Sequence, residues 1–299
     1  MMKGICTGLF FSFLSVLVFG ESPVALSGTL EWDRMELNAA VILNLAPAGI
    51  RLPAGRSRAE ELIDTEYPAL IRSHILSILT DSSSTLEDLM ERGEFSLRNA
   101  GSIALSAGRV PPTVSADLAT LSASYTIDLT NISALLIRHS HAMDIRRPLI
   151  PVPAATYTGI IIIAYEELPV HGRNSSALPV PCLFPKVWDT DMNLIYERNM
   201  LNPDNTAQKT MVRYVSPEDI FRSNPSGLSP ELGALVGANP LRILARGVFG
   251  IHPTDPIIDR DDALVILSSE SNRQLLREGR VAIALNPGTL KRPLNPPDE

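Results

Sequence analysis

Hydrophobic and polar residues follow recognisable strand patterns in the first half of the chain. Apolar and polar residues alternate between Leu30 and Met35, and a continuous apolar run follows at Val41–Leu43. Successive side chains of a strand point to opposite faces, so this pattern predicts an exposed-edge strand that becomes buried at the apolar run. A further strand is expected in the stretch ASYTIDLT, which begins at Ala123.

Helical spacing lies between these two strands. Ser57 and Glu60 stand three residues apart, as in a capping box, and apolar residues recur after them at helical intervals as far as Leu79. Pro68 falls inside this pattern and lacks a backbone donor, so we expect a kink or a break there. A second, short helix is expected to start near Thr85.

The second half of the chain opens with four consecutive isoleucines, Ile160–Ile163. β-Branched residues favour strands, and the run is far too short to cross a bilayer as a helix. The run therefore predicts a central strand that is buried on both faces. Glu166 and Glu167 follow it, and solvated charges at a strand end are favoured over acid–base chemistry because no opposing acidic group is identifiable.

A hairpin is predicted next. Val187–Trp188 and Leu194–Tyr196 are short apolar segments on either side of the sequence DTDMN. Asp and Asn tolerate turn conformations and bond to their own backbone, which favours a tight connection between two strands.

The last third of the chain predicts a strand, a helix and a closing strand. The first strand covers Leu241–Phe249, a turn follows, Asp259 is placed to cap the helix, and Gly279 is placed to end it. The closing strand covers Arg280–Leu285. A helix directly followed by a buried strand, after several earlier strands, indicates the α+β fold class, with mixed sheets packed with helices in two compact regions.

The N-terminus has the layout of a secretory signal peptide. Lys3 precedes an apolar run of about 15 residues, from Ile5 to Phe19, which is shorter than the roughly 20 residues of a spanning helix. We expect cleavage near Gly20, a periplasmic mature protein and no membrane span in the mature chain. An uncleaved N-terminal anchor is the alternative, whereas a lipoprotein is disfavoured because Cys6 lies at the start of the apolar run.

Composition divides the rest of the chain at a proline-rich connector, residues 146–156. Prolines lack a donor and hold the backbone extended, so a short linker is favoured there. The predicted organisation is a signal peptide (1–20), an N-terminal α+β region (21–150), a second α+β region (151–285) and a loose proline-rich tail (286–299).

Charge argues against one class of partner. The chain has 33 acidic and 26 basic residues, a formal net charge of −7, and no basic cluster longer than a pair. Binding to nucleic acid requires a concentrated basic face, so it is disfavoured.

Reactive side chains form no convincing catalytic set. Cys182 lies among apolar residues, which predicts a buried, inert thiol. His139 and His141 could be a pair of metal ligands, but no third ligand is identifiable, and surface or hydrogen-bonding histidines are the favoured interpretation. Ser175 lies near His171 without the glycine pattern of a nucleophile elbow, which favours a loop.

A calcium loop is imitated but not completed. Asp189, Asp191 and Asn193 match the start of such a loop, whereas Leu194 replaces the required glycine and Met200 replaces the distal glutamate. We therefore predict no catalytic, cofactor-binding or metal-binding residues and no cofactor.

A family resemblance is carried by the order of several segments: YTGIIIIA, then PCLFPKVWDTDMNLIYER, MVRYVSPED, GANPLRILARGVFGIHPTDPIIDRDDALVIL and REGRVAIAL. This order, over roughly residues 157–285, resembles periplasmic proteins of the FlgP-like flagellar group. The resemblance implies an exported scaffold protein that assembles near the outer membrane or around the flagellar motor.

The leading hypothesis is a non-enzymatic structural or scaffold protein of the periplasm, associated with the flagellar motor or cell envelope. It would form homo-oligomers through sheet edges and helix faces, and would contact motor or envelope proteins. The alternative is a periplasmic ligand-binding or adaptor module, which an apolar cavity with a few convergent polar groups would favour. A hydrolase is the third hypothesis.

Overall fold

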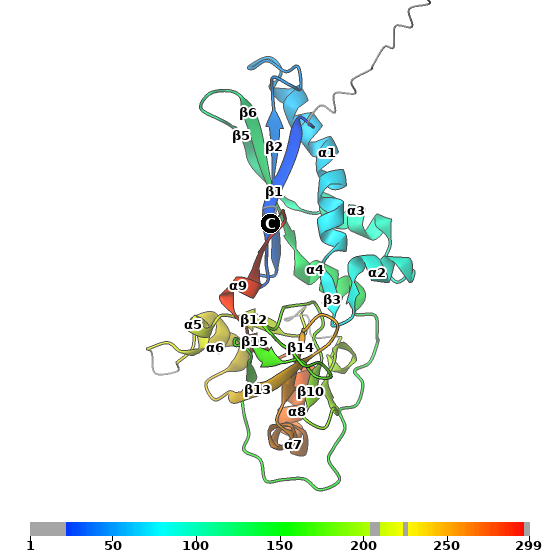
Figure 1. Cartoon of the computed structure of the whole chain (residues 1–299), viewed down its shortest axis with the longest axis vertical. Helices are drawn as coiled ribbons and strands as arrows, with labels where there is room; N and C mark the ends of the chain where they lie inside the picture. Colours follow the sequence, from blue (N-terminus) through cyan, green and yellow to red (C-terminus); the bar gives the residue numbers. More distant parts are fainter. Residues whose placement is uncertain (1–21, 204–209, 224–226, 296–299) are drawn as a thin grey trace, which may run out of the picture.

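The computed structural model describes residues 22–203, 210–223 and 227–295. The predicted signal peptide lies outside these residues. The described chain forms two lobes that lie one above the other along the long axis of the molecule (Figure 1). Each lobe combines a β-sheet with helices, which confirms the predicted α+β fold class.

The first lobe is built on an antiparallel sheet with α1 packed against it. In spatial order its strands are β16 (Lys291–Pro293), β1 (Val24–Glu31), β2 (Glu36–Asn44), β6 (Thr120–Asp128) and β5 (Gly108–Val114). In β2 and β6 buried and more exposed residues alternate, so one face of the sheet belongs to the core and the other faces outward. The strand predicted from Ala123 is confirmed.

The prediction of a single strand through Leu30 and Val41 is wrong, because the chain reverses between them. The strands β1 and β2 form a hairpin whose turn carries Asp33 and Arg34. At the end of this turn Met35 adopts a positive φ of 54° and its N–H bonds to the carbonyl of Trp32. Alternation of apolar and polar residues continues on both sides of the turn, so the pattern alone conceals the reversal.

The helix α1 (Arg56–Leu76) runs without interruption through Pro68. The expected break is therefore absent, because a proline removes only one hydrogen bond of the helix and the buried side chains on either side hold it to the sheet. The predicted capping box is also wrong. Gly55 is the N-cap residue and Ser57 lies within the first turn, beyond the position from which it could cap.

Four small elements lead from α1 to β5, and a fifth, α4, follows β6. They are β3 (Leu79–Asp81), β4 (Ser84–Thr85), α2 (Leu86–Glu91), α3 (Leu97–Leu105) and α4 (Leu129–Leu136). The helix expected near Thr85 is confirmed as α2, and its N-terminus has a capping box formed by Thr85 and Asp88.

The second lobe contains a mixed sheet. In spatial order its strands are β11 (Leu194–Tyr196), β10 (Val187–Asp189), β14 (Asp255–Ile258), β13 (Leu241–Phe249), β7 (Ile160–Ile163), β15 (Val281–Ala284) and β12 (Arg213–Val215). A separate two-stranded sheet pairs β8 (Leu168–Pro169) with β9 (Ser176–Ala177). The remaining elements are the 3₁₀ helix η1 (Arg198–Met200) and the helices α5 (Pro217–Ile220), α6 (Pro230–Val236), α7 (Arg260–Ser268), α8 (Glu270–Arg277) and α9 (Pro287–Leu290).

The isoleucine run forms the central strand that its composition predicts. The strand β7 pairs in parallel with β13 on one side and with β15 on the other. Ile160 and Ile162 belong to the main core, whereas Ile161 packs in a second cluster with residues of α6 such as Leu232. Both faces of the strand are therefore buried.

The predicted strand–helix–strand order at the end of this lobe needs two corrections. The turn expected after β13 contains the strand β14, which pairs with both β13 and β10. The helix capped by Asp259 stops at Ser268, and a second helix begins at Glu270, because Ser269 between them has an extended backbone. The closing strand is confirmed as β15.

The prediction of a loose tail is wrong for the part of it that is described. After β15 the chain forms α9 and then β16, which returns to the first lobe and pairs with β1. Pro287 is the first residue of α9, where a missing N–H costs nothing, and Pro293 lies on the outer strand of the sheet. Prolines are thus placed where ordered structure tolerates them.

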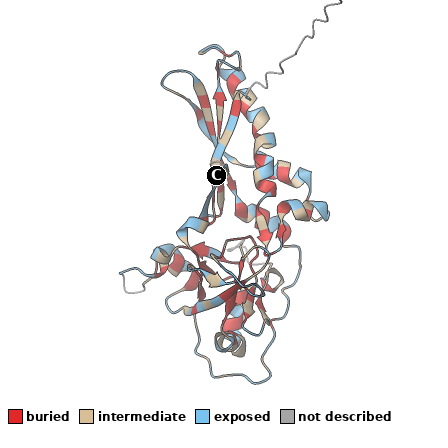
Figure 2. Cartoon of the chain, in the orientation of Figure 1, coloured by how far each residue is buried: buried red, intermediate tan, exposed pale blue. Residues whose placement is uncertain are grey.

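Backbone hydrogen bonds join the two lobes directly. Residues Leu79, Thr80 and Ser82 of the first lobe accept hydrogen bonds from N–H groups of the second lobe, at N···O distances of 3.0, 2.8 and 3.0 Å. Their donors are Leu183, Phe184 and His252. Trp32 and Tyr214 also meet edge to face across this seam, with ring centroids 6.0 Å apart. Buried side chains form a cluster that includes residues of both lobes (Figure 2).

The connector between the lobes is tied to α8. The side chain of Asn272 in α8 accepts a hydrogen bond from the N–H of Tyr157 and donates one to the carbonyl of Ala155. Glu270 accepts from Arg147 of the connector at 3.3 Å, and from Arg273 and Arg277 of its own helix. The hydrogen bond from Arg273, together with that from Arg277, lowers the pKa of the Glu270 carboxyl to about 2.

Replacing Gly250 tests the seam. Gly250 has a φ of 122°, and a Cβ atom added there would lie 2.4 Å from the Cβ of Ser82 in the first lobe and 2.4 Å from the carbonyl oxygen of His252 in its own lobe. Gly172 also has a positive φ, of 76°, but open space surrounds its Cβ position. We expect Gly250→Ala to destabilise the protein by about 2 kcal/mol more than Gly172→Ala in denaturant unfolding, because only the first change places a Cβ against Ser82 across the seam and against His252 beside it. Equal losses would contradict a close seam at this point.

Glu270 makes stability depend on pH in acid. Its folded-state pKa lies below the ordinary value of 4.5, so its contribution is complete above pH 4.5 and is lost as the pH falls toward 2. We expect Glu270→Gln to lower the melting temperature at pH 7, and this difference from the wild type to disappear near pH 2. The control is Glu61→Gln, which removes the same charge from an exposed position of α1. If the melting temperatures of Glu270→Gln and the wild type differed by the same amount at pH 7 and pH 2, the stabilising role assigned to the ionised Glu270 carboxylate would be wrong.

Candidate functional site

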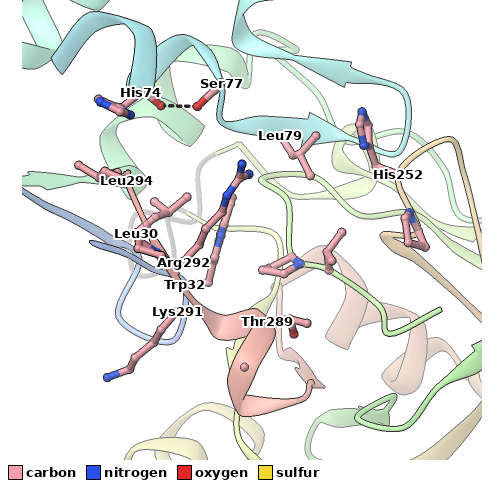
Figure 3. Close-up of a pocket in the computed structure, with 15 residues that line it drawn as sticks. Leu30, Trp32, His74, Ser77, Leu79, His252, Thr289, Lys291, Arg292 and Leu294 are labelled. Atoms are coloured by element: carbon pink, nitrogen blue, oxygen red, sulfur yellow. Dashed lines mark hydrogen bonds between the residues drawn. The ribbon is translucent and has the colours of Figure 1, made fainter. Parts of the chain in front are cut away.

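A cavity of about 490 Å³ opens at the seam between the lobes (Figure 3). Its walls come from β1 and the turn after it, the C-terminal end of α1, β3, the loops at 180–181 and 252–253, α9, and β16. The lining residues are Leu30, Trp32, His74, Ser77, Leu79, Val180, Pro181, His252, Pro253, Gly288, Thr289, Lys291, Arg292, Pro293 and Leu294.

The pairing of β16 with β1 decides which side chains face the cavity. Leu30 lies directly opposite Arg292, and Glu31 lies directly opposite Lys291. Residues opposite each other in an antiparallel pair point to the same face, and neighbours along a strand point to opposite faces. Arg292 therefore shares the cavity face with Leu30, and Lys291 points away from the cavity (Figure 3).

The two cations of β16 consequently differ in their electrostatic surroundings. The ammonium nitrogen of Lys291 lies 3.6 Å from a carboxylate oxygen of Glu31. Arg292 makes no side-chain hydrogen bond or ion pair within the part of the chain that the structure describes. The guanidinium of Arg292 is thus the uncompensated charge of the site.

Two histidines border the same cavity. Burial lowers the pKa of His74, at the end of α1, which favours its neutral form. His252 donates its backbone N–H to Ser82, and its side chain lies within electrostatic range of Asp88. Among the described residues, no acidic side chain lines the cavity.

The floor of the cavity is apolar. Trp32 is only 3% exposed and rests against Tyr214 of the second lobe, and Leu30 is also buried. Leu79 and Val180 extend this surface from β3 and from the second lobe. An apolar floor beside one unpaired cation is typical of a cavity that holds a small ligand.

Sequence reasoning missed this site. The tail that contains Arg292 is rich in prolines and was expected to be loose, so its residues were not considered as a wall. A usable signal was present in the alternation of Leu290, Arg292 and Leu294, which places every second residue of the tail on one face.

The histidines considered as metal ligands are engaged in local hydrogen bonds. His139 Nε2 lies 2.8 Å from the carbonyl oxygen of Leu201, and His141 Nδ1 lies 2.9 Å from the hydroxyl of Ser140. In the segments covered by the structure, no three His, Cys, Asp or Glu side chains are grouped to hold a metal ion.

The acidic hairpin turn is a structural element. Asp189 is buried, and its Oδ1 accepts hydrogen bonds from the backbone N–H groups of Asp191 and Asn193, at 2.9 and 2.8 Å. Asp191 pairs with Arg260 at 3.1 Å. The predicted hairpin is confirmed, and the carboxylate of Asp189 closes its turn.

The remaining candidates lie apart from the cavity. Cys182 is buried and unpaired, as predicted, and burial raises the pKa of its thiol well above the usual range. Glu166 and Glu167 are exposed at the strand end, also as predicted. Ser175 and His171 lie in an exposed loop, and among the described residues their side chains form no hydrogen bond with each other.

The part of the chain that the structure describes contains no helix long and apolar enough to span a bilayer. This agrees with the prediction for the mature chain.

Comparisons with known proteins cover both lobes. The family model of the N-terminal domain of Treponema pallidum Tp0624 matches residues 23–135, and the model of the second domain of the same protein matches residues 159–287. No curated protein matches the chain. Neither family match is to a FlgP-like protein, so that narrower resemblance stays a prediction. Over these two segments, in the same order, the chain is similar to the N-terminal and second domains of Treponema pallidum Tp0624, a spirochaete protein family.

Proposed function

We propose that this chain is a non-enzymatic structural or scaffold protein of the periplasm, exported by a signal peptide that is cleaved near Gly20. The observation that carries the proposal is the seam, where backbone hydrogen bonds and the Trp32–Tyr214 contact join two lobes into one body. A fixed relative placement of two surfaces suits a protein that holds partners at a set distance. The similarity of both lobes, in order, to domains of one spirochaete family supports a conserved two-lobe unit.

The proposed partners are further copies of the chain and proteins of the flagellar motor or cell envelope. The flagellar part rests on the FlgP-like order of strands and turns in the second lobe. The similarity to Tp0624 supports a spirochaete family without naming a partner.

The edges of the first sheet are poor surfaces for assembly. The strand β5 contains Pro111 and Pro112, and β16 contains Pro293 beside two cations. Proline and charged side chains on outer strands prevent another strand from pairing there. The part of the earlier hypothesis that used sheet edges is therefore not retained for this sheet.

The connector offers a better contact surface. Leu149 and Ile150 are 102% and 82% exposed, on a segment held to the second lobe at Arg147 on one side and Val152 on the other. When a partner covers two adjacent exposed aliphatic side chains, the removal of their surface from water stabilises the complex. We place the contact between copies of the chain at these two residues.

A ligand-binding or adaptor module is the second candidate function. The seam cavity favours it, because an apolar floor and a few polar groups converge there from both lobes.

Oligomerisation is tested by changing the connector. We expect the mature protein to form oligomers in sedimentation analysis, and Leu149→Ser with Ile150→Ser to convert them to monomers. The matched control is Leu118→Ser, which alters a 63% exposed leucine between β5 and β6 and should leave the oligomer intact. A wild-type monomer at high protein concentration would refute the proposed contact.

Localisation is tested by fractionation with an antibody. We expect the mature protein, shortened by about the length of the signal peptide, in the periplasmic or envelope fraction and in purified flagellar basal bodies. Presence in the envelope but absence from basal bodies would refute only the flagellar part. A full-length protein in the cytoplasmic fraction would refute the periplasmic scaffold.

A further inference from the structure

We propose that the seam cavity binds a small amphiphilic anion, with its carboxylate or phosphate on Arg292 and its apolar body on the floor formed by Leu30, Trp32 and Leu79. This inference goes beyond the scaffold function and does not depend on oligomerisation.

The dimensions of the cavity fit such a ligand. Sites for small molecules commonly have volumes of about 300–1,000 Å³, and this cavity has about 490 Å³. Leu30 and Trp32 are already packed in the core, so the floor exists before a ligand arrives. An alkyl or aryl body placed on it loses contact with water without requiring the lobes to move.

Arg292 defines the charge of the ligand. A guanidinium presents a planar fork of N–H donors that matches a carboxylate or phosphate, and it stays charged at any physiological pH. Arg292 is directly opposite Leu30 in the strand pair, so its charge stands at the border of the apolar floor. A ligand with an anionic head and an apolar body satisfies both surfaces at once.

The arrangement also disfavours other ligand classes. Lys291 is compensated by Glu31 on the opposite face of the strand, and no carboxylate of the described residues lines the cavity. A cation would therefore meet Arg292 without any compensating charge. A neutral apolar molecule would contact the floor without forming an ion pair with the exposed guanidinium, and so should bind less tightly.

His74 and His252 border the cavity on opposite sides of Arg292. Figure 3 shows both imidazoles bordering the cavity, from the end of α1 and from the second lobe. A neutral imidazole can donate one hydrogen bond to an anionic oxygen. These two side chains are therefore polar groups in the wall of the cavity in addition to Arg292.

Titration calorimetry with three ten-carbon probes tests the proposal on the whole mature chain. The probes are decanoate, decyl phosphate and decanol, which share one apolar body and differ in the head group. We expect decanoate or decyl phosphate to saturate one site, and decanol to bind at least tenfold more weakly. The tighter of the two anions distinguishes a carboxylate ligand from a phosphate ligand.

A pair of variants locates the site. We expect Arg292→Gln to weaken binding of the anions at least tenfold and to leave decanol unaffected. Lys291→Gln removes the same charge from the adjacent residue on the opposite face and should change the affinity less than twofold. Ser77→Trp, which fills the cavity from the end of α1, should weaken all three probes.

Three results would overturn the proposal. They are no saturable binding of either anion, equal losses in Arg292→Gln and Lys291→Gln, and decanol binding as tight as that of the anions. The oligomeric state of Arg292→Gln, measured in parallel, should match the wild type. If Arg292→Gln loses anion binding but still forms oligomers, ligand binding and assembly use different surfaces. If the wild-type protein is a monomer but binds the anions, only the scaffold proposal is refuted.

Discussion

The seam between the β3–β4 turn and the second lobe is the constraint on which the rest of the structure depends. Three carbonyl groups of one short segment, at Leu79, Thr80 and Ser82, accept N–H groups from two separate loops of the other lobe. Buried backbone groups without partners are costly, so neither lobe can withdraw from this contact without exposing or orphaning them. The relative orientation of the lobes is thus set by main-chain geometry, which side-chain substitutions at the surface do not alter.

The cavity is a consequence of the same contact. The end of α1, the loop at 252–253 and β16 approach one another only because the turn holds the lobes together. Residues of both lobes line the cavity, so neither lobe alone encloses it. A ligand there would touch both lobes, which makes structural support and ligand binding two uses of one junction.

Local patterns predicted the elements whose signal lies within a few residues. The isoleucine run, the Asp189 turn and the cap at Asp259 each combine residue type and spacing at one place, and each was found as expected. Tertiary contacts decided the rest. Alternation continues through the turn before Met35, packing carries α1 through Pro68, and β14 is a strand because two neighbours pair with it. The alternation in the tail could place Arg292 on one face of a strand, but it could not bring that strand to Leu79, which lies more than 200 residues away in the sequence.

The return of the chain at β16 also has a consequence for the order of folding. The strand β1 is among the first described residues and β16 is among the last, yet they are neighbours in one sheet. A chain that emerges from a ribosome or a translocation channel delivers β1 early, and one edge of β1 then stays open until the whole second lobe has followed. An open strand edge can pair with other chains. The chain is therefore prone to aggregation during the time between the synthesis of β1 and that of β16. The first lobe is therefore completed last, because its sheet gains β16 only after the second lobe has been made.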